Sequence, residues 1–207
     1  DAYVINTCAV THTGEQKSAR VIRRIAETAS GFEPKPVVAV VGCLAQISPE
    51  KIAAINGVDL VVGMADRPRL PEIVHDYMDK RQKTIQVSSE SGGGWVDLPS
   101  GGAVSADERT RATLKIEEGC EQYCAYCVVP LARGKICSMP PPRVKQEFSS
   151  LLAKDYKEIV LAGINLGCYG KDGHGSLMEL LQSLTEVPGD YRIRLGSIEP
   201  LELSEEL

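Results

Sequence analysis

From Asp1 to about Lys83, short runs of β-branched residues alternate with stretches whose apolar residues recur at helical spacing. The runs AYVINT, PVVAVVG and DLVVG predict strands, and the stretches between and after them predict helices near 15–30, from residue 49, and near 69–80. Thr13, three residues before Gln16, predicts a capping box, and Ser48 before Pro49 predicts a helix start. This rhythm predicts an α/β domain with a parallel sheet covered by helices.

The same rhythm returns later in the chain. ATLKIEE, EIVLAGI and RIRLGSI predict strands, and two apolar stripes at helical spacing predict core-facing helices between them. Their members are Val144, Phe148, Leu151 and Leu152, and then Leu177, Leu180, Leu181 and Leu184. The stretch SSESGGGWVDLPSGGAVSA has the Gly/Ser-rich composition of a flexible connector. We therefore expect one domain over 1–87, a linker over 88–106 and a second domain over 107–207.

Composition narrows the class of protein. The chain has 207 residues, of which 43% are hydrophobic, and a net charge of −5. This charge excludes a protein that coats nucleic acid through a generally basic surface. No apolar run approaches the ~18 residues of a membrane span, and no signal or transit pattern opens the sequence, so we expect a cytoplasmic protein with no membrane partner. Seven cysteines, an odd number without framework spacing, indicate thiolate ligands rather than disulfides.

The stretch GCEQYCAYC places Cys120, Cys124 and Cys127 in a C-x3-C-x2-C pattern without a fourth cysteine. Structural zinc sites and ordinary iron–sulfur clusters have four protein ligands, so three indicate a metal site with an open position. Because Cys120 follows a predicted strand, the loop is expected at the carboxyl edge of a sheet or barrel, where ligands bind. Two alternatives remain: a zinc knuckle with a distant fourth ligand, and part of a ferredoxin cluster-binding sequence. Against them, no histidine lies near the loop, and ferredoxins have a different cysteine spacing and a fourth cysteine.

A second pair of cysteines follows two strands of the N-terminal half. Cys8 ends AYVINT and Cys43 ends PVVAVVG, so both thiols are expected at the same carboxyl edge of a parallel sheet, where they could bind one ion or cluster. Free cysteine is also commonly buried as a small apolar residue, and that alternative stays open.

The C-x3-C-x2-C loop after a first barrel strand resembles the signature of the radical S-adenosylmethionine enzymes. The resemblance implies a [4Fe-4S] cluster on Cys120, Cys124 and Cys127, with S-adenosyl-L-methionine on its fourth iron. Tyr126 occupies the position at which that family places an aromatic ring against the adenine, and ordinary loop packing is its alternative.

Longer stretches resemble one branch of that superfamily. YVINTCAVTHTGEQKSARVIRR, VVGCLAQISPE, GCEQYCAYCVVPLARG, AGINLGCYG and RIRLGSIEP are similar to the tRNA methylthiotransferases, above all those acting on N6-threonylcarbamoyladenosine. The resemblance implies a second [4Fe-4S] cluster on three cysteines, two of which match Cys8 and Cys43, and a second domain that is the first part of a partial TIM-like β/α barrel. The first of those three cysteines would lie upstream of Asp1 and further strands beyond Leu207, so we expect an internal fragment.

The activity implied by this resemblance is radical methylthiolation of C2 of the hypermodified adenosine next to the anticodon. Its partners would be tRNA, a reducing electron donor and a sulfur donor, and no side chain would serve as an acid or base. The alternatives are a branch acting on isopentenyladenosine in tRNA or on a ribosomal protein, or a non-enzymatic iron–sulfur or zinc protein.

Five further residues are weaker candidates. Lys17, Arg20 and Arg24 share one face of the first helix and could follow an RNA backbone, although a solvated helix face explains them too. Ser197 and Glu199 end a predicted strand, where they could meet the ribose or amino group of the cofactor, or cap the next helix.

The sequence departs from the family after Arg133 and Gly134. Cys137 and Met139 stand where arginines are expected, and neither can replace the bidentate contacts of a guanidinium with phosphate or carboxylate. Cys137 and Cys168 match no ligand of the family, and we predict that both are structural.

Overall fold

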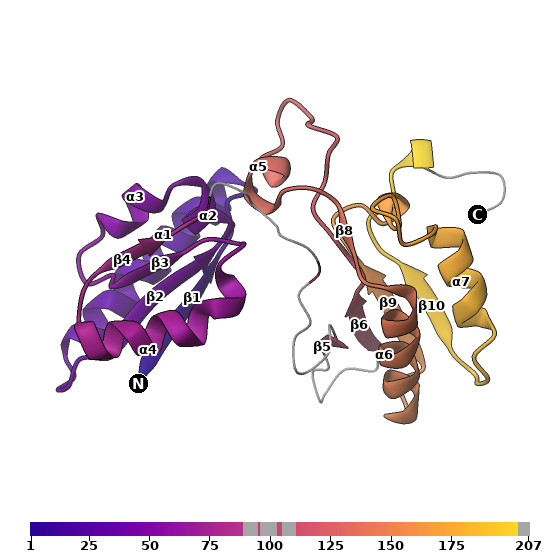
Figure 1. Cartoon of the computed structure of the whole chain (residues 1–207), viewed down its shortest axis with the longest axis horizontal. Coiled ribbons are helices and arrows are strands. Elements are labelled where there is room, and N and C mark those ends of the chain that lie inside the picture. The colour runs from indigo at the N-terminus through magenta and orange to yellow at the C-terminus, as the bar shows by residue number, and fades with distance from the viewer. Residues whose placement is uncertain (89–94, 96–102, 105–110, 203–207) are drawn as a thin grey trace. The chain divides into compact units, whose positions relative to one another are not determined.

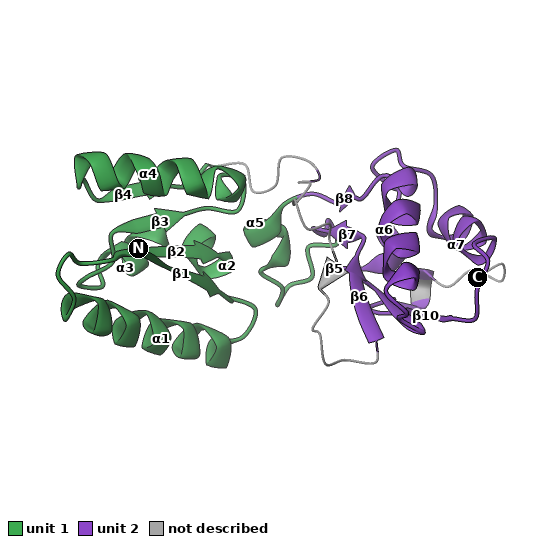
Figure 2. Cartoon of the chain, turned by 90° about the horizontal axis from the view of Figure 1, so that it is seen from below, with its two compact units in different colours: residues 1–93, 122–134 green, residues 94–121, 135–207 purple. Residues whose placement is uncertain are grey.

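The computed structural model describes residues 1–88, 95, 103–104 and 111–202. The contacts of the chain divide it into two compact units, coloured separately in Figure 2: unit 1 comprises residues 1–93 and 122–134, and unit 2 comprises residues 94–121 and 135–207. Most of the predicted linker, 88–106, lies outside the described residues, so the predicted domain boundaries stay a prediction. That segment 122–134 groups with the first unit was not expected from any sequence pattern.

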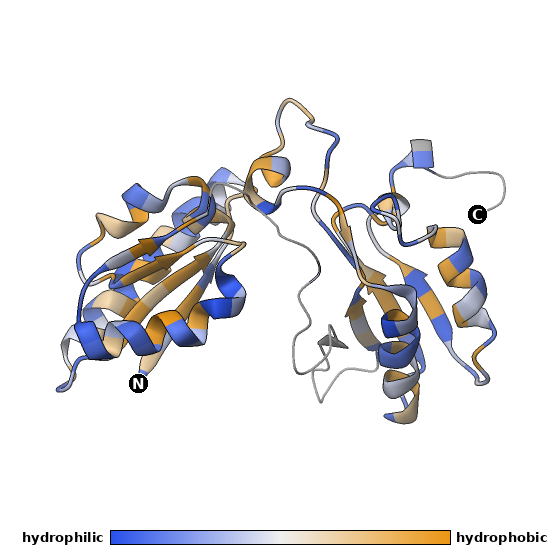
Figure 3. Ribbon diagram, in the orientation of Figure 1, coloured by the Kyte–Doolittle hydropathy of each residue, from blue (hydrophilic) through white to orange (hydrophobic). Residues whose placement is uncertain are grey.

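Unit 1 contains a four-stranded parallel sheet in the order β1-β2-β3-β4 (Figure 1). Its strands are β1 (Ala2–Thr7), β2 (Val37–Gly42), β3 (Leu60–Val62) and β4 (Thr84–Gln86). Every residue of β2 is buried, as expected for a parallel strand covered on both faces, and the strands of this sheet are largely apolar in Figure 3. The predicted parallel sheet is confirmed, while β4, with the short sequence TIQ, carries no apolar run that would have predicted it.

Helices cover both faces of this sheet. They are α1 (His12–Ser30), α2 (Cys43–Ile47), α3 (Pro49–Ala53) and α4 (Leu70–Lys80), the last preceded by the 3-10 turn η1 (Arg67–Arg69). Ile22 of α1 packs in one cluster with Val38 and Val40, whereas Tyr77 of α4 packs in another with Val37. Because neighbouring side chains of a strand point to opposite faces, β2 lies between two helical layers.

The start of α1 differs from the prediction. Thr11 is the N-cap residue, and its side chain accepts a hydrogen bond of 3.0 Å from the backbone N–H of Gly14. Thr13 lies inside the helix, so the predicted capping box of Thr13 and Gln16 is wrong. Thr11 has an extended backbone, which allows its hydroxyl to reach the N–H groups of the first helical turn. Thr13 has a helical backbone and therefore cannot serve as the N-cap residue. Ser48 is confirmed as the N-cap residue of α3, which begins at Pro49, although its side chain makes no capping hydrogen bond.

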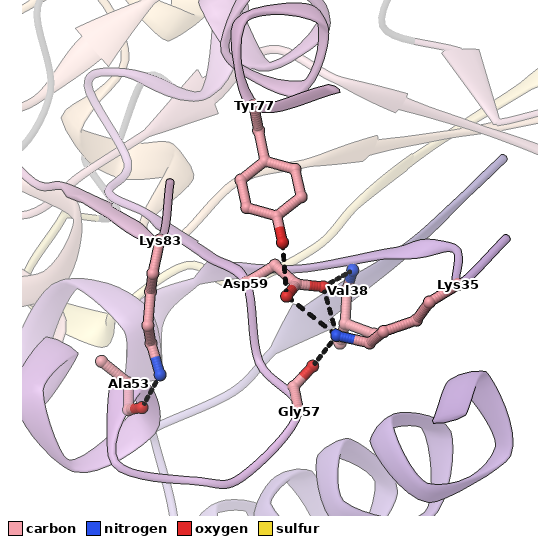
Figure 4. Close-up of polar contacts among 7 residues, drawn as sticks. All are labelled: Lys35, Val38, Ala53, Gly57, Asp59, Tyr77 and Lys83. Atoms are coloured by element: carbon pink, nitrogen blue, oxygen red, sulfur yellow. Dashed lines mark hydrogen bonds and ion pairs between the residues drawn. The ribbon is translucent and has the colours of Figure 1, made fainter. Parts of the chain in front are cut away.

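A polar network joins the elements at the amino edge of this sheet (Figure 4). The buried carboxylate of Asp59 pairs with Lys35 at 2.9 Å and accepts hydrogen bonds from the Tyr77 hydroxyl at 2.7 Å and the Val38 N–H at 2.9 Å. Burial, and then the bond to Asp59, raise the pKa of Tyr77 to about 12. Since Asp59 precedes β3 whereas Cys8 and Cys43 follow strands, this network lies at the edge opposite the cysteines and stabilises the fold.

Unit 2 contains a second sheet, in the order β10-β9-β6-β5. Its strands are β5 (Ala103–Val104), β6 (Arg111–Lys115), β9 (Glu158–Ala162) and β10 (Arg192–Leu195), and its helices are α6 (Pro141–Ala153) and α7 (Leu177–Thr185). Strands β6, β9 and β10 are parallel, and β5 pairs antiparallel with β6. Phe148 and Leu180 pack with Leu114 and Ile159 in its core, which confirms the two predicted apolar stripes.

A small antiparallel pair, β7 (Glu117–Glu118) with β8 (Cys137–Ser138), follows β6 in unit 2. The α/β class is confirmed for both units, whereas the four-stranded sheet described in unit 2 does not by itself form a barrel. Within the described part of the chain, none of the helices combines the length and apolar character that a membrane span requires.

Candidate functional site

Cys8 and Cys43 line one pocket at the carboxyl edge of the sheet of unit 1. Cys8 directly follows β1, and Cys43 begins α2 directly after β2. The register pairs Thr7 with Gly42, the last residues of the two strands, so the cysteines that follow them are neighbours at this edge. The pocket has a volume of about 370 Å³. The common edge expected for these two thiols is therefore present.

Gly42 makes the turn from β2 into the cysteine-bearing helix possible. Its φ is +97°, and a Cβ atom at this position would lie 2.5 Å from the side-chain oxygen of Asn6 and from the carbonyl oxygen of Thr7. Glycine adopts such a backbone without steric cost and leaves room for the neighbouring strand. The close approach of β1 and the start of α2 thus depends on this glycine.

The sulfur of Cys43 has a cationic partner. The side chain of Cys43 is only 2% exposed, and its Sγ accepts a hydrogen bond of 3.3 Å from Nε of Arg133. Arg133 ends the short helix α5 (Val129–Arg133), which packs against α2 within unit 1. Cys8 is exposed, and its Sγ accepts from the backbone N–H of Val10 at 3.5 Å.

The charge of the pocket lining suits an anion. Lys17, Arg67 and Arg133 line it, and among the described residues no aspartate or glutamate does. Thiolates bound to iron and the sulfides of a cluster carry negative charge, which nearby cations stabilise. Two thiols beside three cations are therefore a donor set that fits an iron–sulfur cluster, with Cys8 and Cys43 supplying two of its ligands.

The three cysteines of the C-x3-C-x2-C loop fall on both sides of the division between units. Cys120 is buried in unit 2, whereas the exposed Cys124 and the half-buried Cys127 belong to unit 1, where the Cys127 N–H donates to the Cys124 carbonyl at 2.8 Å. Across residues 1–88, 95, 103–104 and 111–202, no three or more Cys, His, Asp or Glu side chains are arranged to hold a metal ion. The ligand role of these cysteines stays a prediction from their spacing.

Tyr126 stands out from the loop. The residue is 91% exposed, and ordinary loop packing stays the alternative to a role in cofactor binding. Its contact with an adenine ring stays a prediction.

The weaker candidates lie at the surface. Lys17, Arg20 and Arg24 are all exposed on α1, and Lys17 lines the cysteine pocket. Ser197 and Glu199 are exposed after β10, and the carbonyl of Glu199 accepts from the Glu202 N–H at 3.0 Å at the 3-10 turn η3 (Pro200–Glu202). Of these five residues, Lys17 alone lines the pocket of Cys8 and Cys43 in the described part of the chain, and the roles of all five stay predictions.

A buried polar cluster in unit 2 was missed in the sequence. Glu117 is fully buried, and its Oε2 accepts from the backbone N–H groups of Ile164 at 2.6 Å and Asn165 at 2.9 Å. Burial raises the pKa of Glu117 to about 7. The side-chain amide of Asn165 donates to Glu202 at 3.0 Å. Glutamate is rarely buried. The alternation of apolar residues that ends at Ile116 also places Glu117 on the face opposite to the apolar one, so the sequence pattern did not predict its burial.

Cys137 and Cys168 lie in unit 2, and within the described residues neither belongs to a group of three possible metal ligands. Burial raises the pKa of each thiol to about 11. Cys168 also hydrogen-bonds to Glu202 at 3.0 Å. Thiols of this kind stay protonated and unreactive at neutral pH, which supports the prediction that both are structural.

Comparison with known proteins finds relatives along the whole chain. Residues 1–63 match the model of "Uncharacterized protein family UPF0004". The chain is 42% identical to threonylcarbamoyladenosine tRNA methylthiotransferase MtaB of Bacillus subtilis over 216 residues, which cover 100% of the chain and 45% of that protein. By sequence, the chain is similar over its whole length to tRNA methylthiotransferases.

Two further relatives distinguish the branches of this family. MtaB of Thermotoga maritima is 38% identical over 99% of the chain and 45% of its own length. The tRNA-2-methylthio-N(6)-dimethylallyladenosine synthase of Carboxydothermus hydrogenoformans is 30% identical over 100% of the chain and 47% of its own length. Of these three relatives, the two MtaB proteins have the higher identities, and the chain spans about half the length of the curated relatives it matches.

Proposed function

We propose that this chain forms part of an enzyme that methylthiolates C2 of N6-threonylcarbamoyladenosine next to the anticodon of tRNA. The observation that carries the proposal is the 42% identity over the whole chain with a protein named for this activity. We infer that the protein acts in the cytoplasm on tRNA, with a reducing electron donor and a sulfur donor.

The cysteines divide into two sets in this proposal. Cys120, Cys124 and Cys127 hold the [4Fe-4S] cluster that binds S-adenosyl-L-methionine, and Cys8 and Cys43 hold two ligand positions of a second [4Fe-4S] cluster. When bound, these cofactors supply radical and sulfur-transfer chemistry, which a side-chain base cannot replace because the C2–H of a purine is too weakly acidic. Tyr126 supports the adenine ring, and Ser197 and Glu199 contact the ribose or amino group.

Several features of the chain support these roles. The pocket at Cys8 and Cys43 combines two thiols with three cations, the environment that an anionic cluster requires. In unit 2, the parallel strands β6, β9 and β10, with α6 and α7, have the βα connectivity of the first part of a β/α barrel. The exposed Lys17, Arg20 and Arg24 are available to RNA phosphates.

Anaerobic reconstitution of the full-length protein tests the proposal. The expected protein takes up iron and sulfide, shows an electron paramagnetic resonance signal that S-adenosylmethionine alters, and yields methylthiolated threonylcarbamoyladenosine in digested tRNA. Uptake of zinc without iron would favour a non-enzymatic binding protein instead. Methylthiolation of isopentenyladenosine alone would move the chain to the other tRNA branch.

A further inference from the structure

We propose that Arg133 is a positioning residue for the sulfur of Cys43 and balances its charge, so that the segment carrying Cys124 and Cys127 takes part in the N-terminal cysteine site. This inference rests on the proposed function, because it treats Cys43 as a cluster ligand. It goes further by assigning a role to an arginine that is distant in sequence and that no metal-ligand pattern includes.

The contact itself is specific. Nε of Arg133 donates to Sγ of Cys43 at 3.3 Å, across 90 positions of the sequence. A guanidinium keeps its charge at all physiological pH values, and its Nε–H lies in a rigid plane, so it is a permanent donor of fixed direction. Because the side chain of Cys43 is only 2% exposed, water has little access to compete for this sulfur.

The backbone that carries Arg133 is held in place. Val129, Pro130 and Ala132 of α5 are buried, and α5 packs against α2, the helix that Cys43 begins. The helix ends at Gly134, whose φ of +80° lets the chain turn away directly after Arg133. Arg133 is thus fixed by apolar packing, and its side chain points to the sulfur from an anchored base.

This arrangement has two consequences for a cluster at Cys43. Hydrogen bonds to cluster sulfurs and nearby positive charge favour the reduced form and raise its potential. Arg133 also lies six positions after Cys127 in the same segment, so the chain that supplies two radical-site cysteines is joined to the N-terminal site by a hydrogen bond to a ligand. Removing the guanidinium should therefore change the N-terminal cluster while leaving every cysteine in place.

The test uses the full-length protein with Cys120, Cys124 and Cys127 replaced by alanine, so that only the N-terminal cluster remains. In this parent we compare Arg133→Gln, Arg133→Lys and, as the control, Arg23→Gln, which removes an exposed arginine from α1. We measure the iron content, the circular dichroism spectrum and the midpoint potential of the cluster. The potential is obtained from a redox titration monitored by electron paramagnetic resonance. We expect a more negative potential or a loss of iron in R133Q, a smaller change in R133K, and none in R23Q.

The outcomes separate the two proposals. A parent without iron would contradict the proposed function, and this inference would fall with it. A parent with a cluster whose iron content and potential are the same in R133Q would overturn the role of Arg133 alone. Loss of the native circular dichroism spectrum in both R133Q and R133K would assign Arg133 to fold stability and would also overturn it.

Discussion

Glu117 is fully buried in unit 2, and its Oε2 accepts a hydrogen bond of 2.9 Å from the backbone N–H of Asn165. Its other oxygen, Oε1, is buried without a hydrogen-bond partner among the described residues. An ionised carboxylate is therefore only half compensated here, which is why burial raises its pKa from 4.5 to about 7.

This relationship predicts a pH dependence of stability. The folded state binds the Glu117 proton more tightly than the unfolded state does. The contribution of Glu117 to the free energy of unfolding is therefore fully present below pH 4.5 and is lost as the pH rises through about 7. A shift of this size corresponds to roughly 3 kcal/mol. Glu117→Gln should flatten the fall in unfolding free energy between about pH 5 and 8. Urea denaturation followed through the single tryptophan, Trp95, which packs on the core of unit 2, measures it.

The matched control is Glu186→Gln, which changes an exposed glutamate in the same unit. It should keep the pH dependence of the parent. If the unfolding free energy changed equally with pH in the parent and in E117Q, Glu117 would have an ordinary proton affinity in the folded chain.

Gly42→Ala should destabilise unit 1 and disturb the cysteine pocket. The substitution combines a φ of +97° with a Cβ only 2.5 Å from atoms of Asn6 and Thr7, so we expect a loss of roughly 1–3 kcal/mol or more. Gly31→Ala is the control, because Gly31 has a φ of −85° and its added Cβ would meet nothing closer than 3.5 Å. Thermal unfolding of both variants decides this, and equal stability of the two would contradict the steric argument.

Asp59→Asn should weaken the network in Figure 4. Its carboxylate is shared by Lys35, Tyr77 and the Val38 N–H, and loss of its charge leaves the partly buried ammonium of Lys35 without a counter-charge. We expect a loss of about 1–3 kcal/mol in unfolding free energy. Asp76→Asn, which removes an exposed ion pair with Lys80, should cost less than about 0.5 kcal/mol. Chemical denaturation compares them, and similar losses would mean that burial adds nothing to the Asp59 network.

The helices and strands could be predicted from the sequence where burial produces a local pattern of apolar residues. VVAVVG predicted β2 because a strand covered on both faces is apolar throughout, and the spacing of Val144 and Phe148 predicted α6 because one face of that helix is buried. The bond from Arg133 to Cys43 left no such pattern, because it joins residues 90 positions apart through a segment whose packing is tertiary. Of the candidate site, the placement of the two cysteines that follow strands was predictable, and the contact of Arg133 with Cys43 was not.

Replacing Cys120, Cys124 or Cys127 by alanine in the full-length protein should abolish reductive cleavage of S-adenosylmethionine. A loop with two thiolates lacks the ligands that hold a cluster with one open iron. Cys137→Ala and Cys168→Ala serve as controls and should keep both iron and cleavage, because each is a protonated thiol of raised pKa. Formation of 5′-deoxyadenosine, measured by chromatography, distinguishes the two groups. Cleavage at the normal rate in any of the first three variants would end the assignment of that loop.

The two cysteine sets should be separable in function. In the full-length protein, Cys8→Ala with Cys43→Ala removes both thiols from the pocket of unit 1 but leaves Cys120, Cys124 and Cys127 unchanged. This double variant should still cleave S-adenosylmethionine, and its iron content should fall by about half because one of two [4Fe-4S] clusters is lost. It should not methylthiolate tRNA, since the sulfur-transfer site is gone. Mass spectrometry of digested tRNA provides the measurement, and a methylthiolated nucleoside formed by the double variant would show that Cys8 and Cys43 are not required for sulfur transfer.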